Sequence, residues 1–156
     1  MSKSLKRVRA ALEAAGVTYD LREMSAPTRT AQEAADAAGC HIDQIAKAII
    51  FRGESSGHVR LFLTAGGNRV SAEKASAVAG EALGKADAEL IRAETGFAIG
   101  GVAPVGHLSP VQAYLDPRLM EFDLVWAAAG TPRHIFSIAP NALHSLTGAA
   151  ISDFTD

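Results

Sequence analysis

The chain has 156 residues, of which 48% are hydrophobic and 21% charged, and its formal net charge is −2. This length and apolar content suit one sizeable core, so we expect a single domain over residues 1–156. The near-neutral charge argues against binding DNA by phosphate neutralisation. Neither an apolar leader nor a run of transmembrane length is present, and the single cysteine, Cys40, fits a reducing compartment. We therefore expect a cytoplasmic protein with no membrane partner.

The first half of the chain predicts two helices, a short strand and a β-hairpin. These elements fall at residues 4–15 (amphipathic helix), 19–24 (strand), 31–38 (helix), and 47–51 with 59–63 (hairpin strands). Thr30 and Glu33 have the spacing of a capping box, and Gly39 is a typical helix stop.

The second half alternates helices with short strands and begins after a loop at residues 65–69. Its expected helices cover residues 72–79, capped by Ser71, then 87–95 and 140–146, with a helical turn at 116–117. Its expected strands cover residues 97–107, which run into a tight loop, then 111–115, 122–127 and 133–138. Because some strands are joined by hairpins and others through helices, we expect an α/β (α+β) fold with a curved mixed β-sheet or partly closed barrel surrounded by helices.

Several standard catalytic motifs are absent from the sequence. It contains no His-Glu-x-x-His, paired CxxC, GxxxxGK[ST] or GxGxxG pattern, so zinc hydrolysis and nucleotide binding lack their usual residues. The GxSxG spacing occurs at residues 53–57, but these form the expected turn between the hairpin strands and not the strand-to-helix turn that carries a serine nucleophile. We expect neither a metal nor a cofactor. Cys40 is interpreted as a small buried residue and not as a nucleophile.

A glycine-rich segment, residues 96–107, stands out inside apolar surroundings. It can be a bulge and a turn, or its backbone amides around Gly100 and Gly101 can face a cavity and bind the oxyanion that develops during hydrolysis. Lys47 opens a strand that is otherwise apolar. Its ammonium either borders a pocket or reaches solvent along its stem.

Three segments together resemble the YbaK-like family, the free-standing relatives of the editing domain inserted in bacterial prolyl-tRNA synthetase. They are residues 44–51, residues 67–71, and the GxxxP stretch 100–104 followed by Val-Gly-His. The resemblance implies the curved mixed-sheet fold and the removal of a wrongly attached amino acid from tRNA-Pro. The partners it implies are aminoacylated tRNA and prolyl-tRNA synthetase.

The resemblance also implies roles for individual residues. Lys47 is required for activity and meets the terminal adenosine or its phosphate, while Gly100 and Gly101 belong to the catalytic loop. The implied substrate-binding residues are Val102, Ala103, Pro104, His134, Asn68, Arg69 and Ser71. Two of these keep a structural alternative: His134 as a satisfied core histidine, and Ser71 as a helix cap.

The mechanism implied is attack by water, with backbone stabilisation of the oxyanion and assistance from the ribose 2′-hydroxyl of the substrate. The apolar loop favours a small amino acid such as alanine, cysteine or 2-aminobutyrate. Serine and threonine stay open, because one methylene changes binding by only roughly 1–3 kcal/mol. The alternative function is a noncatalytic tRNA-binding or synthetase-associated module.

Overall fold

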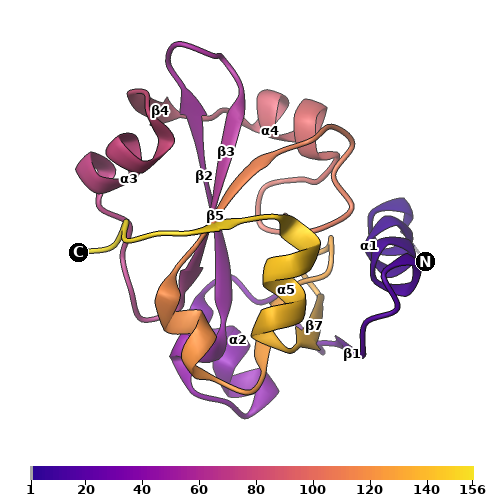
Figure 1. Ribbon diagram of the computed structural model, residues 1–156. Helices are drawn as coiled ribbons and strands as arrows, with labels where there is room; N and C mark the ends of the chain where they lie inside the picture. The colour runs from indigo at the N-terminus through magenta and orange to yellow at the C-terminus, as the bar shows by residue number, and fades with distance from the viewer. Residues whose placement is uncertain (1) are drawn as a thin grey trace.

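A computed structural model describes residues 2–156 (Figure 1). Within them lie five α-helices and two short 3-10 helices. The α-helices are α1 (Lys3–Ala14), α2 (Ala31–Ala38), α3 (Ala72–Ala79), α4 (Ala88–Thr95) and α5 (Pro140–Thr147), and the 3-10 helices are η1 (Ile42–Gln44) and η2 (Pro117–Glu121). None of these helices is both long and apolar enough to cross a membrane.

The described strands form two sheets. The larger is mixed, with the order β4-β2-β3-β5-β8, and the smaller is antiparallel, with the order β1-β7-β6. The strands are β1 (Tyr19–Glu23), β2 (Ala46–Gly53), β3 (Val59–Ala65), β4 (Leu83–Lys85), β5 (Gln112–Leu115), β6 (Val125–Ala128), β7 (His134–Ile138) and β8 (Ala150–Ile151). A parallel bridge between Ile45 and Trp126 brings the start of β2 beside β6.

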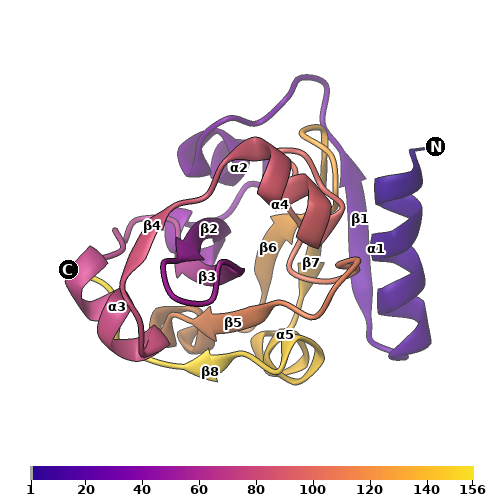
Figure 2. The same ribbon diagram turned by 90° about the horizontal axis from the view of Figure 1, so that it is seen from above.

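The fold class expected from the sequence is confirmed, in the form of two sheets that do not close into a barrel. Figure 2 shows the helices on the outside of the sheets, with α1 running alongside β1. Buried side chains of α1, namely Leu5, Val8 and Leu12, belong to the main core. This apolar stripe explains why the first helix docks against the rest of the molecule.

Local sequence signals placed most elements correctly. The capping box of α2 is present, since the Thr30 hydroxyl accepts from the Glu33 amide and the Glu33 carboxylate accepts from the Thr30 amide. Gly39 ends that helix in the left-handed conformation, with φ of 73°. The β2–β3 hairpin is antiparallel and pairs Lys47 with Thr64.

The expected strand within residues 97–107 is wrong. The segment is irregular, and its glycines explain why: Gly96, Gly100 and Gly106 have φ values of 81°, 90° and 81°, which a strand does not allow. Its apolar side chains are nevertheless buried, with Phe97 and Ala103 fully inaccessible. Two short strands, β4 and β8, were not expected from the sequence.

Candidate functional site

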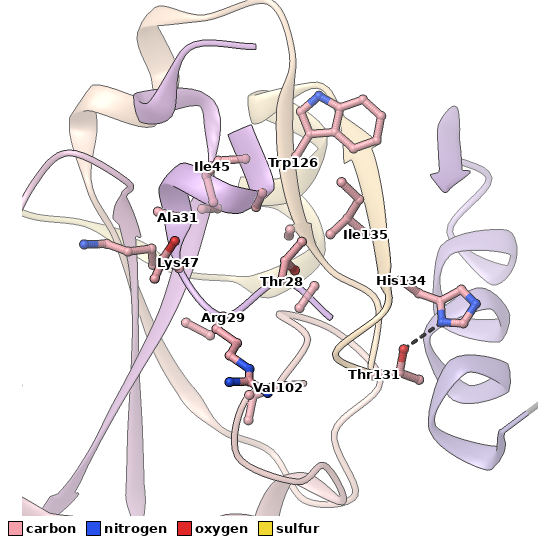
Figure 3. Close-up of a pocket in the computed structure, with 17 residues that line it drawn as sticks. Thr28, Arg29, Ala31, Ile45, Lys47, Val102, Trp126, Thr131, His134 and Ile135 are labelled. Atoms are coloured by element: carbon pink, nitrogen blue, oxygen red, sulfur yellow. Dashed lines mark hydrogen bonds between the residues drawn. The ribbon is translucent and has the colours of Figure 1, made fainter. Parts of the chain in front are cut away.

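A cavity of about 280 Å³ opens where the two sheets meet, and we call it the main cavity (Figure 3). Its walls come from the segment before α2, the start of β2, the glycine-rich loop and the β6–β7 hairpin. The lining residues are Thr28, Arg29, Thr30, Ala31, Ala34, Ile45, Ala46, Lys47, Ala48, Gly100, Val102, Trp126, Ala127, Ala128, Thr131, His134 and Ile135. Most of them are apolar, and the charged side chains are Arg29, Lys47 and, when protonated, His134.

Lys47 lines this cavity, but its ammonium group is directed away from the other labelled residues (Figure 3). The Nζ atom donates to the backbone carbonyl of Asn68, 2.6 Å away. Partial burial lowers the pKa of Lys47, and the nearby positive charge of Arg69 lowers it further, while Asp116 and Asp43 act in the opposite direction. The lysine therefore sits in an anchored, partly desolvated position at one end of the cavity.

The loop that holds this lysine is itself fixed by a buried carboxylate. Asp116 is 2% exposed and accepts from the Asn68 side chain at 2.9 Å and from the Ala65 amide at 3.1 Å. It also caps η2 through the Arg118 amide. Asn68 thus contacts Lys47 and not the cavity, and its position depends on Asp116.

The other two predicted residues of this loop also lie off the cavity wall. Arg69 is exposed, and its charge reaches the site only through its effect on the Lys47 pKa. The Ser71 hydroxyl accepts from the Lys74 amide at the start of α3, so its role as a helix cap is confirmed.

The glycine-rich loop contributes Gly100 and Val102 to the cavity. The amide of Gly101 donates to the Ala98 carbonyl, 3.0 Å away, so contrary to expectation it is not available to a ligand in this conformation. The N–H groups of Gly100 and Val102 have no hydrogen-bond partner within residues 2–156. The donors that this loop offers to a bound group are therefore Gly100 and Val102.

Gly101 has a packing role instead. A Cβ atom at this position would lie 3.1 Å from the Thr131 Cα atom and equally close to its backbone N and C atoms. The missing side chain therefore lets the glycine-rich loop approach the β6–β7 hairpin closely.

Ala103 and Pro104 do not line the main cavity, although both were expected to. Ala103 is fully buried, and its carbonyl is 2.7 Å from Nε2 of His107. Pro104 lines a different pocket together with His107 and Leu108. Ala103 and Pro104 are therefore buried residues of the loop that do not face the main cavity.

His134 begins β7 and lines the main cavity and also a neighbouring one, formed with the first turn of α1. Its Nδ1 atom lies 2.6 Å from the Thr131 hydroxyl, and its Nε2 atom lies 3.2 Å from the Glu23 carboxylate. Both ring nitrogens are therefore occupied within the protein.

Arg29 is the charged residue that the sequence reasoning missed. It precedes α2, is exposed, and its guanidinium extends in the direction of Val102 in Figure 3. No acceptor within the described chain contacts its side chain. The capping box that begins at the next residue, Thr30, did locate the helix start, but a sequence pattern does not say which surface a loop residue faces.

Cys40 follows α2 and is partly buried, and burial raises the pKa of its thiol above the ordinary value. A raised pKa leaves less thiolate at neutral pH, so this cysteine lacks the activation that a nucleophile needs.

A family model described as an aminoacyl-tRNA editing domain matches residues 25–146. The chain belongs to this family. The match spans the segment before α2, the β2–β3 hairpin, the glycine-rich loop and the β6–β7 hairpin, so it includes every wall of the main cavity. The YbaK-like relationship expected from the sequence is confirmed.

Solved structures of other proteins share the editing-domain fold over nearly the whole chain. One, described as "a putative trans-editing enzyme for prolyl tRNA synthetase", is 46% identical with a TM-score of 0.92, covering 100% of this chain and 99% of that one. The hypothetical protein APE2540 is 28% identical with a TM-score of 0.87, covering 96% and 99%. A relative found by sequence, the uncharacterized protein YwhH of Bacillus subtilis (strain 168), is 30% identical over 140 residues, which cover 90% of this chain and 88% of the relative.

Proposed function

We propose that this protein is a trans-editing hydrolase that removes a small, wrongly attached amino acid from tRNA-Pro in the cytoplasm. The observation that carries the proposal is a pair of backbone amides, Gly100 and Val102, that have no hydrogen-bond partner among the described residues and lie on the wall of a small apolar cavity bordered by Lys47. Family membership and the 46% identical trans-editing relative support the same activity.

The size and lining of the cavity suit a small aminoacyl group. A volume of about 280 Å³ is modest, and Ala31, Ala34, Ala46 and Ala48 line much of it. Alanine, cysteine and 2-aminobutyrate are the substrates this lining favours, because each buries an apolar or weakly polar side chain without needing a dedicated partner. Such a pocket discriminates among them by only roughly 1–3 kcal/mol, so activity on several is expected.

Two cations are placed to hold the nucleic-acid end of the substrate. The Arg29 guanidinium lies at the cavity with no partner within residues 2–156, and Lys47 lies at another part of the cavity wall. Guanidinium and ammonium groups bind phosphate by charge-assisted hydrogen bonds. We assign Arg29 and Lys47 to the phosphates and ribose of the terminal nucleotides, which orients the ester toward the glycine-rich loop.

In the proposed reaction, water attacks the aminoacyl carbonyl carbon and the bond to the ribose oxygen breaks. The negative charge that develops on the carbonyl oxygen is stabilised by hydrogen bonds donated by the amides of Gly100 and Val102, and the leaving ribose oxygen takes the proton that the attacking water releases. The 2′-hydroxyl of the substrate positions the water. Removing one oxyanion-hole donor costs about a hundredfold or more in other hydrolases.

The test is a deacylation assay with tRNA-Pro charged in turn with alanine, cysteine, serine, threonine, 2-aminobutyrate and proline. We expect rapid ester loss from one or more of the small mischarged species, with prolyl-tRNA spared. A Lys47→Ala variant is expected to lose the activity. Lys85→Ala, which removes an exposed lysine from β4 outside the cavity, is the matched control and should keep the deacylation activity.

The same assay distinguishes a hydrolase from the alternative, a noncatalytic tRNA-binding or synthetase-associated module. Binding of charged tRNA with ester lifetimes equal to those without protein would identify a noncatalytic module. Adding prolyl-tRNA synthetase tests whether that partner increases the deacylation rate. Equal rates for the wild type and Lys47→Ala would contradict the role given to the lysine.

A further inference from the structure

Thr131, His134 and Glu23 form a chain of polar contacts on one wall of the main cavity, in which Thr131 is hydrogen-bonded to His134 and Glu23 lies at ion-pair distance from the same ring. The Thr131 hydroxyl is 2.6 Å from Nδ1 of His134, and the Glu23 carboxylate is 3.2 Å from Nε2 of the same ring. The backbone N–H of Arg133 also donates to the Thr131 hydroxyl oxygen, at 3.2 Å. Figure 3 shows the hydroxyl pointing at the imidazole.

These contacts determine where the protons lie when the imidazole is neutral. The negative charge of Glu23, 3.2 Å from Nε2, favours the proton on that nitrogen of His134. The Nδ1 atom is then an acceptor, and the Thr131 hydroxyl donates its single hydrogen to it. The Arg133 amide occupies one of the two lone pairs on the hydroxyl oxygen, which leaves one lone pair free to accept.

The main cavity otherwise offers little to a cation. None of the lining residues in the described chain is an aspartate or glutamate, and Arg29 and Lys47 are positive. The Thr30 hydroxyl already accepts from the Glu33 amide as the cap of α2. A buried ammonium group is costly unless it is hydrogen-bonded. The Thr28 hydroxyl also lines the cavity and donates to the Pro132 carbonyl at 3.5 Å, but Thr131 is the hydroxyl that is linked through a histidine to a carboxylate.

We propose that the Thr131 hydroxyl binds the α-ammonium group of the aminoacyl ester, with His134 and Glu23 as positioning residues that keep the hydroxyl in its accepting orientation. This inference rests on the proposed deacylase function. It defines the substrate class as esters with a free α-amino group, and it gives His134 a role other than shaping the pocket.

The test compares two esters of the same tRNA: alanyl, which carries the ammonium group, and propionyl, which is the same acyl group without it. For Thr131→Val, kcat/KM on the alanyl ester should fall by about tenfold or more, equivalent to about 1.4 kcal/mol. On the propionyl ester it should be nearly unchanged. Thr131→Ser, which restores the hydroxyl, should recover most of the loss.

The positioning roles are tested with Glu23→Gln, a change at a side chain that is 71% exposed and so compatible with folding. An amide can donate to Nε2, which releases the ring to donate from Nδ1 and fills the free lone pair of Thr131. The preference for alanyl over propionyl ester should therefore fall, while the melting temperature changes little. A purely structural role for Glu23 would leave that preference unchanged.

The outcomes separate this inference from the proposed function. Equal losses on both esters, or no loss on either, would overturn the assignment of Thr131 while deacylation by the wild type still stands. A wild-type protein that hydrolyses neither ester, nor any other mischarged tRNA-Pro, overturns the proposed function and this inference with it.

Discussion

The Nζ atom of Lys47 lies 2.6 Å from the backbone carbonyl of Asn68. This acceptor is a backbone carbonyl, so no side-chain substitution removes it. Asn68 is held in turn by Asp116, whose carboxylate accepts a hydrogen bond of 2.9 Å from the Asn68 side-chain amide. The position of the lysine in the site is thus set by a buried carboxylate that does not line the cavity.

Asp116→Asn should therefore lower both stability and activity. The carboxylate accepts from three donors, and an amide at this position would turn one of its own donors toward them. We expect a loss of about 2 kcal/mol in the free energy of unfolding, measured with urea, together with a lower kcat/KM for deacylation. Asp153→Asn is the control, because that carboxylate is 75% exposed and its ion pair contributes little. Equal effects of the two substitutions would refute the anchoring role.

Arg29→Ala should weaken tRNA binding more than it slows the chemical step. The guanidinium has no partner within the described chain, so its removal leaves the fold intact. We expect KM to rise by about tenfold, with kcat little changed and the effect smaller at high salt. Arg92→Ala, an exposed arginine on α4 away from the cavity, should leave KM unchanged. A drop in kcat at constant KM would place Arg29 in the chemical step instead.

Gly100→Ala tests whether the backbone conformation of the loop matters for deacylation. The residue has φ of +90°, and an added Cβ would meet no protein atom within 4 Å, so the substitution strains the backbone without a clash with the surrounding chain. Gly57→Ala is a matched control in the β2–β3 turn, with φ of +75° and equally open surroundings. Both should lose about 1–2 kcal/mol of stability. Only Gly100→Ala should slow deacylation, because the strain moves an amide that binds the oxyanion, and equal rates for the two variants would argue against that role.

Sequence reasoning succeeded where the signal is local and failed where distant segments meet. Thr30 and Glu33, which lie within four positions, predict a capped helix, and two neighbouring apolar runs predict the β2–β3 hairpin. The burial of Phe97 and Ala103 was visible as an apolar stretch, but such a run is equally compatible with a buried strand and with irregular backbone.

The site shows the same division. Lys47, Gly100 and Val102 were expected at the cavity and are found there, because all three lie in motifs that the family resemblance identifies. Gly101 shows the limit, since its amide is used by Ala98 within the turn. Arg29 and Thr131 reach the cavity only through the approach of α2 and the β6–β7 hairpin, which no local pattern encodes. The pairing of β8 with β5 depends on tertiary contact in the same way.

His107 gives the pH dependence of loop stability a definite sign. The imidazole packs edge-on against Phe97, with ring centroids 5.9 Å apart, and its Nε2 atom is 2.7 Å from the Ala103 carbonyl. Burial lowers the pKa of His107 below its ordinary value of 6.5, and the charge of Arg7 lowers it further. The unfolded chain therefore binds this proton more tightly, so the free energy of unfolding should fall as the pH drops below about 6.5 toward the lower folded pKa.

His107→Gln should remove this part of the pH dependence, because the glutamine amide can still donate to Ala103 but does not titrate. Urea unfolding of both proteins between pH 7.5 and 5 provides the measurement. The wild type should lose more stability than the variant over that interval, and near pH 7.5 it should be the more stable of the two because its ring fills the space beside Phe97. Parallel pH profiles would mean that the His107 proton is bound equally in the folded and unfolded states and would contradict this prediction.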